Sequence, residues 1–399
     1  MPCASALAEK RHGCGGTIPG VSELVQQYLD QILRDHAGDT DGELADYIPE
    51  LAAVDPAGFA ITVSSSDGYV YESGDTTTEF TIQSVSKPFT YALALDRLGE
   101  AAVDAHIGVE PSGEAFNEIS VDDKTKTPKN PMINAGAIAY MLESFGVLDA
   151  DPDEVLDVYF RQCSLRVTST DLARMAATLA RGGLNPLTGR QVTTAHVVRR
   201  TLSVMTTCGM YDAAGDWVSA VGMPAKSGVG GGIAAVLPGQ LGIGVYSPLL
   251  DARGNSVRGV KVCRSLSQEL GLHFLTVSRE SRSTIRAVYD VDDGIRVYEV
   301  HGDLLFAGAE QVLRSVDRDS ADFAAVILDV SRLDSVNDPA RSMLLGLSTQ
   351  LGAEGKAGFL VDPDRRVIPT GHPVADLCFP GVDDAVAAAR AWLQSVPTG

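Results

Sequence analysis

The stretch that decides the fold is residues 81–89, Thr-Ile-Gln-Ser-Val-Ser-Lys-Pro-Phe. Pro88 lacks an amide hydrogen and is tolerated only in the first turn of a helix, where the amides have no intrahelical partner. The stretch therefore predicts a helix that begins close to Ser84. Because residues three apart share one helix face, the Lys87 amine can fold back to the Ser84 hydroxyl.

A serine and a lysine in this arrangement are a candidate nucleophile and base. A neutral Lys87 can take the Ser84 proton, provided that burial or a neighbouring cation lowers the pKa of the lysine. The positive end of the helix dipole and the free amides of the first turn favour a developing oxyanion. Ser-x-x-Lys alone is a weak pattern, because a serine at a helix start is usually only a cap.

A second informative stretch, residues 224–236, is rich in glycine and leads into a predicted strand. Its lysine precedes the glycines, so the spacing does not fit a phosphate-binding P-loop. Lys226-Ser227-Gly228 on an edge strand instead places a second cation and a hydroxyl opposite the nucleophile, as in Ser-x-x-Lys enzymes. The presence of both stretches in this order strengthens the interpretation of each as part of a Ser-x-x-Lys active site.

The segments around these stretches predict a mixed α+β domain. Hydrophobic periodicity and turn residues predict a helix at 21–34, a β-hairpin from 59–63 and 68–72, a helix from Ser84 to Leu98, helices around 138–145, 153–163 and 169–182, and a strand at 241–247. Residues 1–20 are rich in glycine and predict a mobile tail. We therefore expect a catalytic domain over residues 21–275.

The last third of the chain predicts a separate, smaller α/β domain. Residues 276–290 are polar and charged, as in a linker. Strands and helices then alternate over residues 291–399: a strand at 295–300, a helix at 308–315, a buried strand at 324–330, a helix that Asp338 caps and Gly352 ends, a strand at 358–362 and a helix at 383–394. This alternation predicts a small βαβ sheet.

Composition excludes several classes of function. The 399 residues carry a net charge of −20, which disfavours nucleic acid and anionic membranes as partners. There is no run of about 18 apolar residues and no signal peptide, so we expect a cytoplasmic protein. The six cysteines are single and predict free thiols. No ligand spacing indicates a metal, and no motif indicates a cofactor.

Six ordered motifs resemble the serine-dependent glutaminases, and the resemblance runs from about Gly42 to Gly271. The motifs are Asp-Tyr-Ile-Pro at 46–49, Ile-Gln-Ser-Val-Ser-Lys at 82–87, Glu-Pro-Ser-Gly at 110–113, Asn-Pro-Met-Ile-Asn-Ala-Gly-Ala at 130–137, Cys-Gly-Met-Tyr at 208–211 and the stretch at 224–232. The resemblance implies a β-lactamase-like fold and hydrolysis of L-glutamine to L-glutamate and ammonia. It also implies a homo-oligomer.

The same resemblance implies a role for each matching residue. Ser84 is the expected nucleophile and Lys87 its base, and Lys226 and Ser227, which are expected to face them, complete the expected catalytic set. The substrate-binding set is Ser84, Asn134, Tyr159, Tyr211, Val229 and Tyr47. Backbone amides of Ser84 and Val229 are expected to hold the oxyanion, and water then cleaves the glutamyl ester.

One departure from the family follows Ala137. In the family a long, mostly helical stretch comes here and supplies a glutamate and an asparagine that hold the amino-acid end of the substrate. In this chain Ala137 runs almost directly into the segment 138–142, so we expect a shortened helical part. The alternatives are a catalytically impaired glutamine-binding or regulatory protein and, ranked last, a serine hydrolase of β-lactams or peptides.

Residues 291–399 resemble STAS domains through the stretches 302–310 and 328–335. This resemblance implies an interaction or ligand-sensing module with a protein or small-molecule partner. Some members have a phosphorylatable serine in Asp-Ser-Ser-Gly at a helix start, and this chain has Asp-Ser-Val-Asn at 334–337. A phosphoswitch at Ser335 is therefore only weakly supported.

Overall fold

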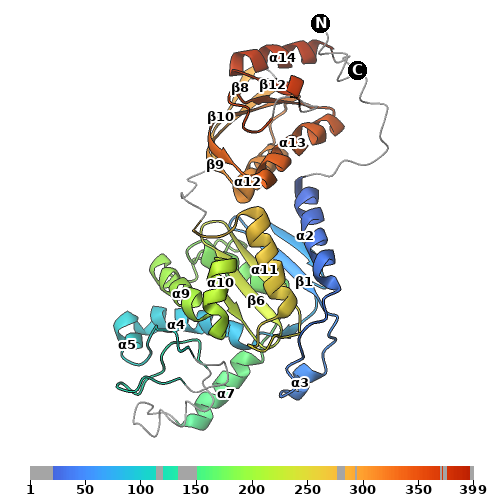
Figure 1. Cartoon of the computed structure of the whole chain (residues 1–399). Helices are drawn as coiled ribbons and strands as arrows, with labels where there is room; N and C mark the ends of the chain where they lie inside the picture. Colours follow the sequence, from blue (N-terminus) through green and yellow to red (C-terminus); the bar gives the residue numbers. More distant parts are fainter. Residues whose placement is uncertain are drawn as a thin grey trace. The chain divides into compact units, whose positions relative to one another are not determined.

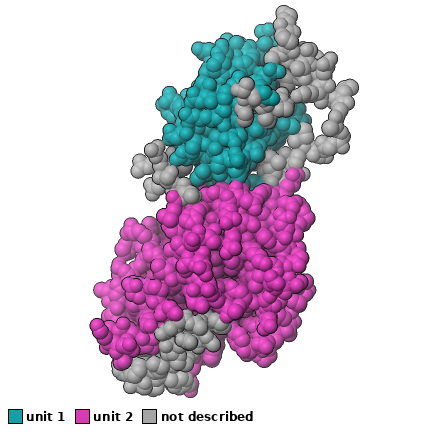
Figure 2. All heavy atoms as spheres, in the orientation of Figure 1, with its two compact units in different colours: residues 1–25, 279–399 teal, residues 26–278 magenta. Residues whose placement is uncertain are grey.

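The computed structural model describes residues 21–113, 120–133, 151–275, 284–292, 294–368, 371 and 375–395. The chain divides into two compact units, one of residues 26–278 and one of residues 1–25 and 279–399 (Figure 2). The predicted tail over residues 1–20 and the predicted helix around 138–145 lie outside the described residues.

A five-stranded antiparallel sheet forms the centre of the first unit. Its strands are β1 (Ala60–Ser65), β2 (Val70–Gly74), β5 (Ala225–Ser227), β6 (Gly232–Leu237) and β7 (Leu241–Tyr246), in the order β2-β1-β7-β6-β5. The predicted hairpin is confirmed, with Val63 opposite Tyr71. β1 also pairs with β7, where Thr62 lies opposite Gly244. The sheet thus joins two segments that are far apart in the sequence, and β5 is its edge.

Helices cover both faces of this sheet. α8 (Ser169–Ala180) packs on β1, β6 and β7, and a Cβ added at Gly244 would lie 2.1 Å from the Ser169 carbonyl oxygen, so this close approach requires glycine. α11 (Val257–Leu270) covers the opposite face, where its Gly259 lies against Ile233 of β6. The sheet offers both faces to helices because successive strand residues point to opposite sides. α2 (Val21–Ala37) lies beside α11, and its Tyr28 hydroxyl donates to Glu269 (Figure 1).

The remaining elements of the first unit include those that carry the candidate site. They are α3 (Pro49–Ala52), β3 (Phe80–Thr81), η2 (Gln83–Ser86), α4 (Lys87–Leu98), α5 (Glu100–Asp104), α7 (Pro152–Cys163), β4 (Arg166–Val167), α9 (Ala195–Cys208), η3 (Tyr211–Ala213) and α10 (Ala214–Ala220). Helices α4 and α9 pack through a cluster that includes Tyr91, Leu95 and Val204. The helices expected at 153–163 and 169–182 are confirmed as α7 and α8, and α8 begins with a capping box of Thr168 and Asp171.

The second unit is a five-stranded α/β sheet of β8 (Ile285–Asp292), β9 (Ile295–Leu304), β10 (Ala325–Val336), β11 (Ala357–Val361) and β12 (Cys378–Phe379), in the order β12-β11-β10-β9-β8. Strands β9 to β12 are parallel and β8 is antiparallel. α14 (Val382–Ser395) packs its Ala385 and Val386 on one face. α12 (Phe306–Asp317) and α13 (Asp338–Ala353) pack against each other and on the sheet.

The structure corrects two details of the sequence prediction in this unit. The cap of α13 is Asn337, not Asp338, because the Asn337 side chain accepts from the Ala340 amide at 3.0 Å. β8 is not among the predicted strands, because most of it falls in the predicted linker at 276–290 and its residues are partly or fully exposed. Ser335 lies within β10, where its hydroxyl donates to Asp303 at 2.6 Å.

Candidate active site

Ser84 lies in the single 3₁₀ turn η2 that runs directly into α4, with Pro88 in the first turn of that helix. The predicted helix start is therefore confirmed. Gln83, immediately before the serine, has a φ of +49°, a left-handed conformation that is uncommon for residues other than glycine and that concentrates at functional sites. The Ser86 hydroxyl donates to the Gln83 carbonyl at 2.7 Å and accepts from Gln162 at 2.8 Å, which holds the turn against α7.

Lys87 is a buried amine one turn beyond Ser84. Its Nζ donates to the Met132 carbonyl at 3.1 Å. Burial lowers the pKa of Lys87 to about 7, and the smaller influence of Cys163 acts in the opposite direction. The neutral amine is therefore well populated near neutral pH, as the chemistry of a general base requires.

Tyr211 contacts the nucleophile from the other side. Its hydroxyl hydrogen-bonds the Ser84 side chain and donates to the Ser227 carbonyl at 3.2 Å. Burial raises the pKa of Tyr211, so the phenol keeps its proton. The residue has a φ of +56°, a second left-handed conformation in the same small region. With its proton directed to Ser227, the phenol meets Ser84 through its oxygen, as an acceptor.

Lys226 is completely buried and lies against the Tyr211 ring. Its Nζ donates to the carbonyl oxygens of Gly209 at 2.9 Å and Ser227 at 2.5 Å, and it lies 4.0 Å from the centroid of the Tyr211 ring. Burial lowers the pKa of Lys226, and the charge of Lys87 lowers it further. The site uses the carbonyl of Ser227, whereas the buried Ser227 hydroxyl has no hydrogen-bond partner among the described residues.

The loop that follows β5 lies against the nucleophile turn. A Cβ added at Gly228 would lie 3.0 Å from the Ile82 carbonyl oxygen, and one at Gly230 would lie 2.4 Å from that of Thr81. Only glycine permits this approach of two backbones. The loop brings Val229 to the site, where its side chain packs on a cluster of Ala45, Leu51 and Leu250.

α7 contributes Tyr159 and a residue that the sequence did not single out, Cys163. The centroid of the Tyr159 ring lies 5.9 Å from the Lys87 Nζ. The Cys163 thiol is buried, hydrogen-bonds Tyr159 and lies close enough to influence the pKa of both Lys87 and Tyr211. Its position four residues after Tyr159 on a predicted helix was the available signal, because such residues share a face.

The structure thus brings together most of the predicted site residues. Tyr47 is 58% exposed and near enough to Tyr211 to raise its pKa. Asn134 and the departure after Ala137 lie outside the described residues. The arrangement combines a turn-borne hydroxyl, a buried amine and a phenol, which is a constellation for acyl transfer.

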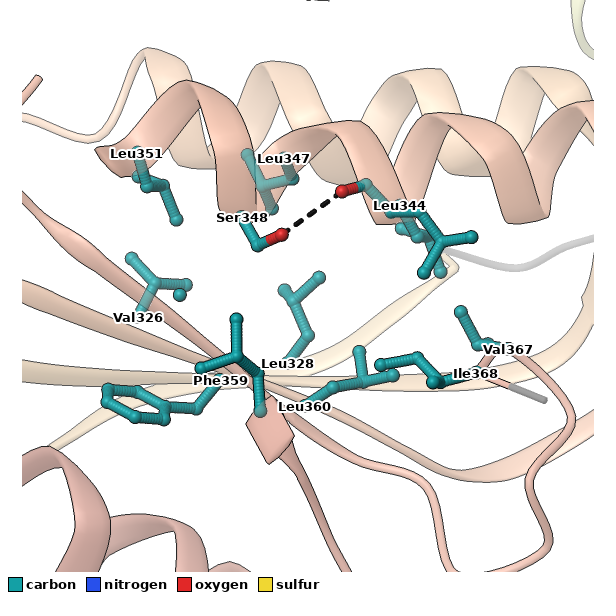
Figure 3. Close-up of a pocket in the computed structure, with 13 residues that line it drawn as sticks. Val326, Leu328, Leu344, Leu347, Ser348, Leu351, Phe359, Leu360, Val367 and Ile368 are labelled. Atoms are coloured by element: carbon teal, nitrogen blue, oxygen red, sulfur yellow. Dashed lines mark hydrogen bonds between the residues drawn. The ribbon is translucent and has the colours of Figure 1, made fainter. Parts of the chain in front are cut away.

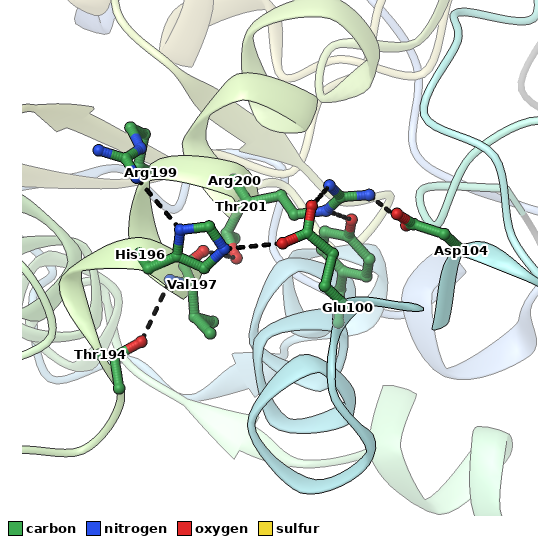
Figure 4. Close-up of polar contacts among 9 residues, drawn as sticks. Glu100, Asp104, Thr194, His196, Val197, Arg199, Arg200 and Thr201 are labelled. Carbon is green, nitrogen blue, oxygen red and sulfur yellow. Dashed lines mark hydrogen bonds and ion pairs between the residues drawn. The ribbon is translucent and has the colours of Figure 1, made fainter. Parts of the chain in front are cut away.

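A polar cluster elsewhere in this unit is structural. The Arg200 Nε donates to the Tyr91 hydroxyl at 2.9 Å, and the same guanidinium pairs with Glu100 and Asp104. The His196 Nε2 meets Glu100 at 2.7 Å (Figure 4). These contacts tie α4 and α5 to α9 and involve none of the residues around Ser84.

Beyond this site, the part of the chain that the structure describes has a small cavity but neither a metal-binding cluster nor a membrane-spanning helix. No group of three or more His, Cys, Asp or Glu side chains there could hold a metal ion. No described helix is long and apolar enough to cross a membrane. A cavity of about 20 Å³ between α13 and its sheet has apolar walls except for Ser348, whose hydroxyl donates to Leu345 (Figure 3). This space holds roughly one water molecule.

Comparison with known proteins identifies two families. The model of the family described as Glutaminase matches residues 42–141 and 137–275, and the model described as STAS domain matches residues 286–377. The two glutaminase segments overlap at residues 137–141, where the shortened part of the chain is expected.

Named relatives agree with these matches. Glutaminase 2 of Bradyrhizobium diazoefficiens is 42% identical, with 82% of this chain and 64% of that protein covered, so the chain spans just under two thirds of that relative. The glutaminase of Corynebacterium glutamicum is 39% identical, with 85% of this chain and 94% of that protein covered. The solved structure of Mglu in its glutamate form has a TM-score of 0.62 and 35% identity, with 86% of this chain and 99% of that chain covered.

One further alignment measures the shortened part. The alignment with the glutaminase of Trichormus variabilis runs over 283 positions at 47% identity, and it takes in 58% of this chain and 85% of that protein. That share of 399 residues is about 231, so about 50 aligned positions have no residue from this chain.

Proposed function

The chain belongs to the glutaminase family and carries a C-terminal STAS domain, and we propose that Ser84 is the nucleophile with which it hydrolyses L-glutamine to L-glutamate and ammonia. The observation that supports this role most is the position of the Ser84 hydroxyl. It lies in the turn before α4, hydrogen-bonded to Tyr211 and three residues from a lysine with a pKa of about 7.

In the first half of the reaction the neutral Lys87 takes the Ser84 proton, and the serine oxygen attacks the carboxamide carbon of glutamine. The backbone amides of Ser84 and Val229 stabilise the oxyanion of the tetrahedral intermediate. Support for Val229 is the close approach of the 228–231 loop to residues 81–83. The protonated Lys87 then returns its proton to the leaving nitrogen, and ammonia departs.

In the second half water attacks the glutamyl ester. Lys87, again neutral, accepts a proton from the water molecule, and the ester bond to Ser84 breaks as the serine oxygen regains that proton. Glutamate leaves, and each group returns to its starting protonation state. No metal or cofactor takes part in this scheme.

Lys226 takes a positioning role in this proposal rather than that of a second base. It contacts the Gly209 carbonyl, the Ser227 carbonyl and the Tyr211 ring. These contacts support an action on Ser84 through Tyr211, whose hydroxyl is proposed to orient the serine. Ser227 contributes the carbonyl that receives the Tyr211 proton, and Tyr159 and Asn134 are proposed to contact substrate, as in the family.

The alternative of a binding or regulatory protein is favoured by one observation, the roughly 50 aligned positions that this chain lacks. Ammonia release from L-glutamine by the purified full chain separates the two functions. We expect release, and binding of glutamine by calorimetry without release would favour the alternative. Hydrolysis of a chromogenic cephalosporin with no ammonia from glutamine would favour the β-lactam hydrolase instead.

The cellular compartment, the oligomeric state and the partner of the STAS domain are also proposals. The four cysteines among the described residues are free thiols, which supports a reducing, cytoplasmic compartment. We further propose that the catalytic unit forms a homo-oligomer, as the family resemblance implies, and that the STAS domain binds a protein or small-molecule partner.

A further inference from the structure

We propose that Gln162 is a positioning residue for the hydrolysis and that it acts on Ser84 through hydrogen bonds with the turn before α4. The Gln162 side chain comes from α7 and donates its amide hydrogen to the Ser86 hydroxyl at 2.8 Å. The inference rests on the proposed function of Ser84 as the nucleophile. It extends that proposal to a second helix, which holds the nucleophile in its reactive position.

The direction of each hydrogen bond follows from the chemistry of the groups. A carbonyl oxygen only accepts, so the Ser86 hydroxyl gives its single proton to the Gln83 carbonyl, at 2.7 Å. The Ser86 oxygen is then left to accept, and the amide nitrogen of Gln162 only donates. Gln162 thereby fixes where the Ser86 proton points. We call Gln162, Ser86 and Gln83, in this order, the α7 relay.

The end of the α7 relay is the peptide bond between Gln83 and Ser84. This bond is planar, and its carbonyl and its amide hydrogen point in opposite directions. A hydrogen bond that fixes the Gln83 carbonyl therefore also aims the Ser84 amide, which is the proposed donor to the oxyanion. Gln83 has a φ of +49°, a left-handed conformation that persists only where its surroundings enforce it. The α7 relay is one of those surroundings.

Main-chain hydrogen bonds hold the backbone on the other side of Gln83. The Ile82 amide donates to the Leu165 carbonyl at 2.8 Å, and β3 pairs with β4. A substitution of the Gln162 side chain does not remove these bonds. The loss of the Gln162 amide should therefore leave the turn docked beside α7 and release only the peptide that leads into Ser84.

The α7 relay is shielded from solvent. Gln162 follows Tyr159 by three residues, so both side chains share the face of α7 that meets the site, where the Tyr159 ring centroid lies 5.9 Å from the Lys87 Nζ. Ser86 is only 4% exposed. Bulk water therefore does not replace the Gln162 amide when it is lost, and hydrogen bonds in such surroundings constrain their partners more than those at a surface.

The first test measures ammonia release from L-glutamine by the full chain and by Gln162→Met, which keeps the side-chain length and removes the donor. We expect kcat to fall about 10- to 100-fold, because a small displacement of the reacting groups has an effect of this size. KM should change less than about threefold. The pH midpoint of kcat/KM should not move, because the α7 relay acts on Ser84 and not on Lys87.

The other outcomes separate the inference from the proposed function. A kcat of Gln162→Met within about twofold of the original, or a change confined to KM, would overturn the inference and leave the proposed function intact. A shifted pH midpoint would assign the effect to Lys87 and overturn it as well. An original chain that releases no ammonia would overturn both.

A double-variant cycle tests the path through Ser86. Ser86→Ala breaks the α7 relay without a change in α7, and it should lower kcat by a similar factor. Adding Gln162→Met to Ser86→Ala should then change kcat by less than about threefold, since no relay remains to be broken. Effects that multiply in the double variant would overturn the path. All rates are measured well below the melting temperature of each variant, so that unfolding does not contribute.

Arg161→Met is the matched control for the substitution in α7. It introduces the same side chain at the neighbouring position, where Arg161 is exposed and its Nε lies 2.8 Å from the Asp157 carboxylate. We expect kcat and KM of this variant to stay within about twofold of the original. A fall in kcat equal to that of Gln162→Met would show a general effect of substitution in α7 and would overturn the role of Gln162.

Discussion

Lys87 and Tyr211 determine what Ser84 can do at the scale of single residues. A serine at a helix start is ordinarily a cap, yet Ser84 lies inside η2, whose N-cap residue is Ile82, and meets the Tyr211 hydroxyl. The adjacent Lys87 is buried deeply enough to lose its proton near neutral pH. These neighbours, rather than the serine itself, make the hydroxyl a nucleophile.

The pKa of Lys87 predicts the pH dependence of catalysis. Because only the neutral amine accepts a proton, and burial lowers the pKa of Lys87 to about 7, kcat/KM for glutamine should rise between about pH 6 and pH 8 and then level off. Initial rates of ammonia release across this range measure it. A profile that is flat through pH 7 would argue against Lys87 as the base.

The same group makes stability depend on pH. The folded-state pKa of Lys87 is about 7, whereas an unfolded lysine titrates near 10.4, so the unfolded chain binds more protons between these values. The free energy of unfolding should therefore rise with pH over this interval, by at most about 1.4 kcal/mol per pH unit. Lys87→Met should be the more stable protein at pH 7, and its advantage should shrink toward pH 10 in denaturant titrations.

Tyr211 is expected to orient Ser84. Tyr211→Phe removes the hydroxyl that meets Ser84 and Ser227 but keeps the ring that faces Lys226. We predict a fall in kcat of about 10- to 1,000-fold with an unchanged far-ultraviolet circular dichroism spectrum. Unchanged kcat would show that the phenol hydroxyl has no role in the reaction.

The sequence predicts the chemistry of this site better than its geometry. The proline at 88 and the Ser-x-x-Lys spacing were sufficient to locate the helix start. The left-handed φ of Tyr211 and the carbonyl of Met132 that receives Lys87 depend on tertiary packing, which no local pattern records. Cys163 was missed because a lone cysteine on an amphipathic helix is ordinarily a core residue.

At the scale of elements, the glycine-rich loop after β5 determines how closely the candidate site packs around the nucleophile turn. It lies on the backbone of residues 81–83, where Gly230 comes closest. The edge position of β5 was predictable from Lys-Ser-Gly. The pairing of β1 with β7 was not predictable from the sequence, because the register between distant segments is set by the packed core.

A pair of glycine substitutions tests this contact. In Gly230→Ala the new Cβ would lie 2.4 Å from the Thr81 carbonyl oxygen, so the loop must move away from the nucleophile turn. We expect a loss of about 1–3 kcal/mol in stability and a lower kcat. Gly215→Ala, in α10 with no atom within 4 Å of its Cβ, should be neutral or slightly stabilising. Equal melting temperatures for the two variants would contradict the close contact.

At the scale of the whole molecule, the net charge of −20 sets the response to salt. Like charges repel across the folded surface, and added ions screen that repulsion. The melting temperature should therefore rise between about 0.01 M and 1 M NaCl, and ammonia release should persist at the upper concentration. A steep loss of activity over this range would count against this reading of the acidic surface.

The organisation into a glutaminase unit and a STAS domain follows from patterns spread along the chain, which is why the sequence predicts it well. The role of Ser84 rests on a few contacts, and one measurement tests it most directly: ammonia release from L-glutamine by the full chain and by Ser84→Ala. The account predicts release by the former and a loss of at least about a thousandfold in the latter, with an unchanged melting temperature. A Ser84→Ala protein that releases ammonia at the original rate would contradict it.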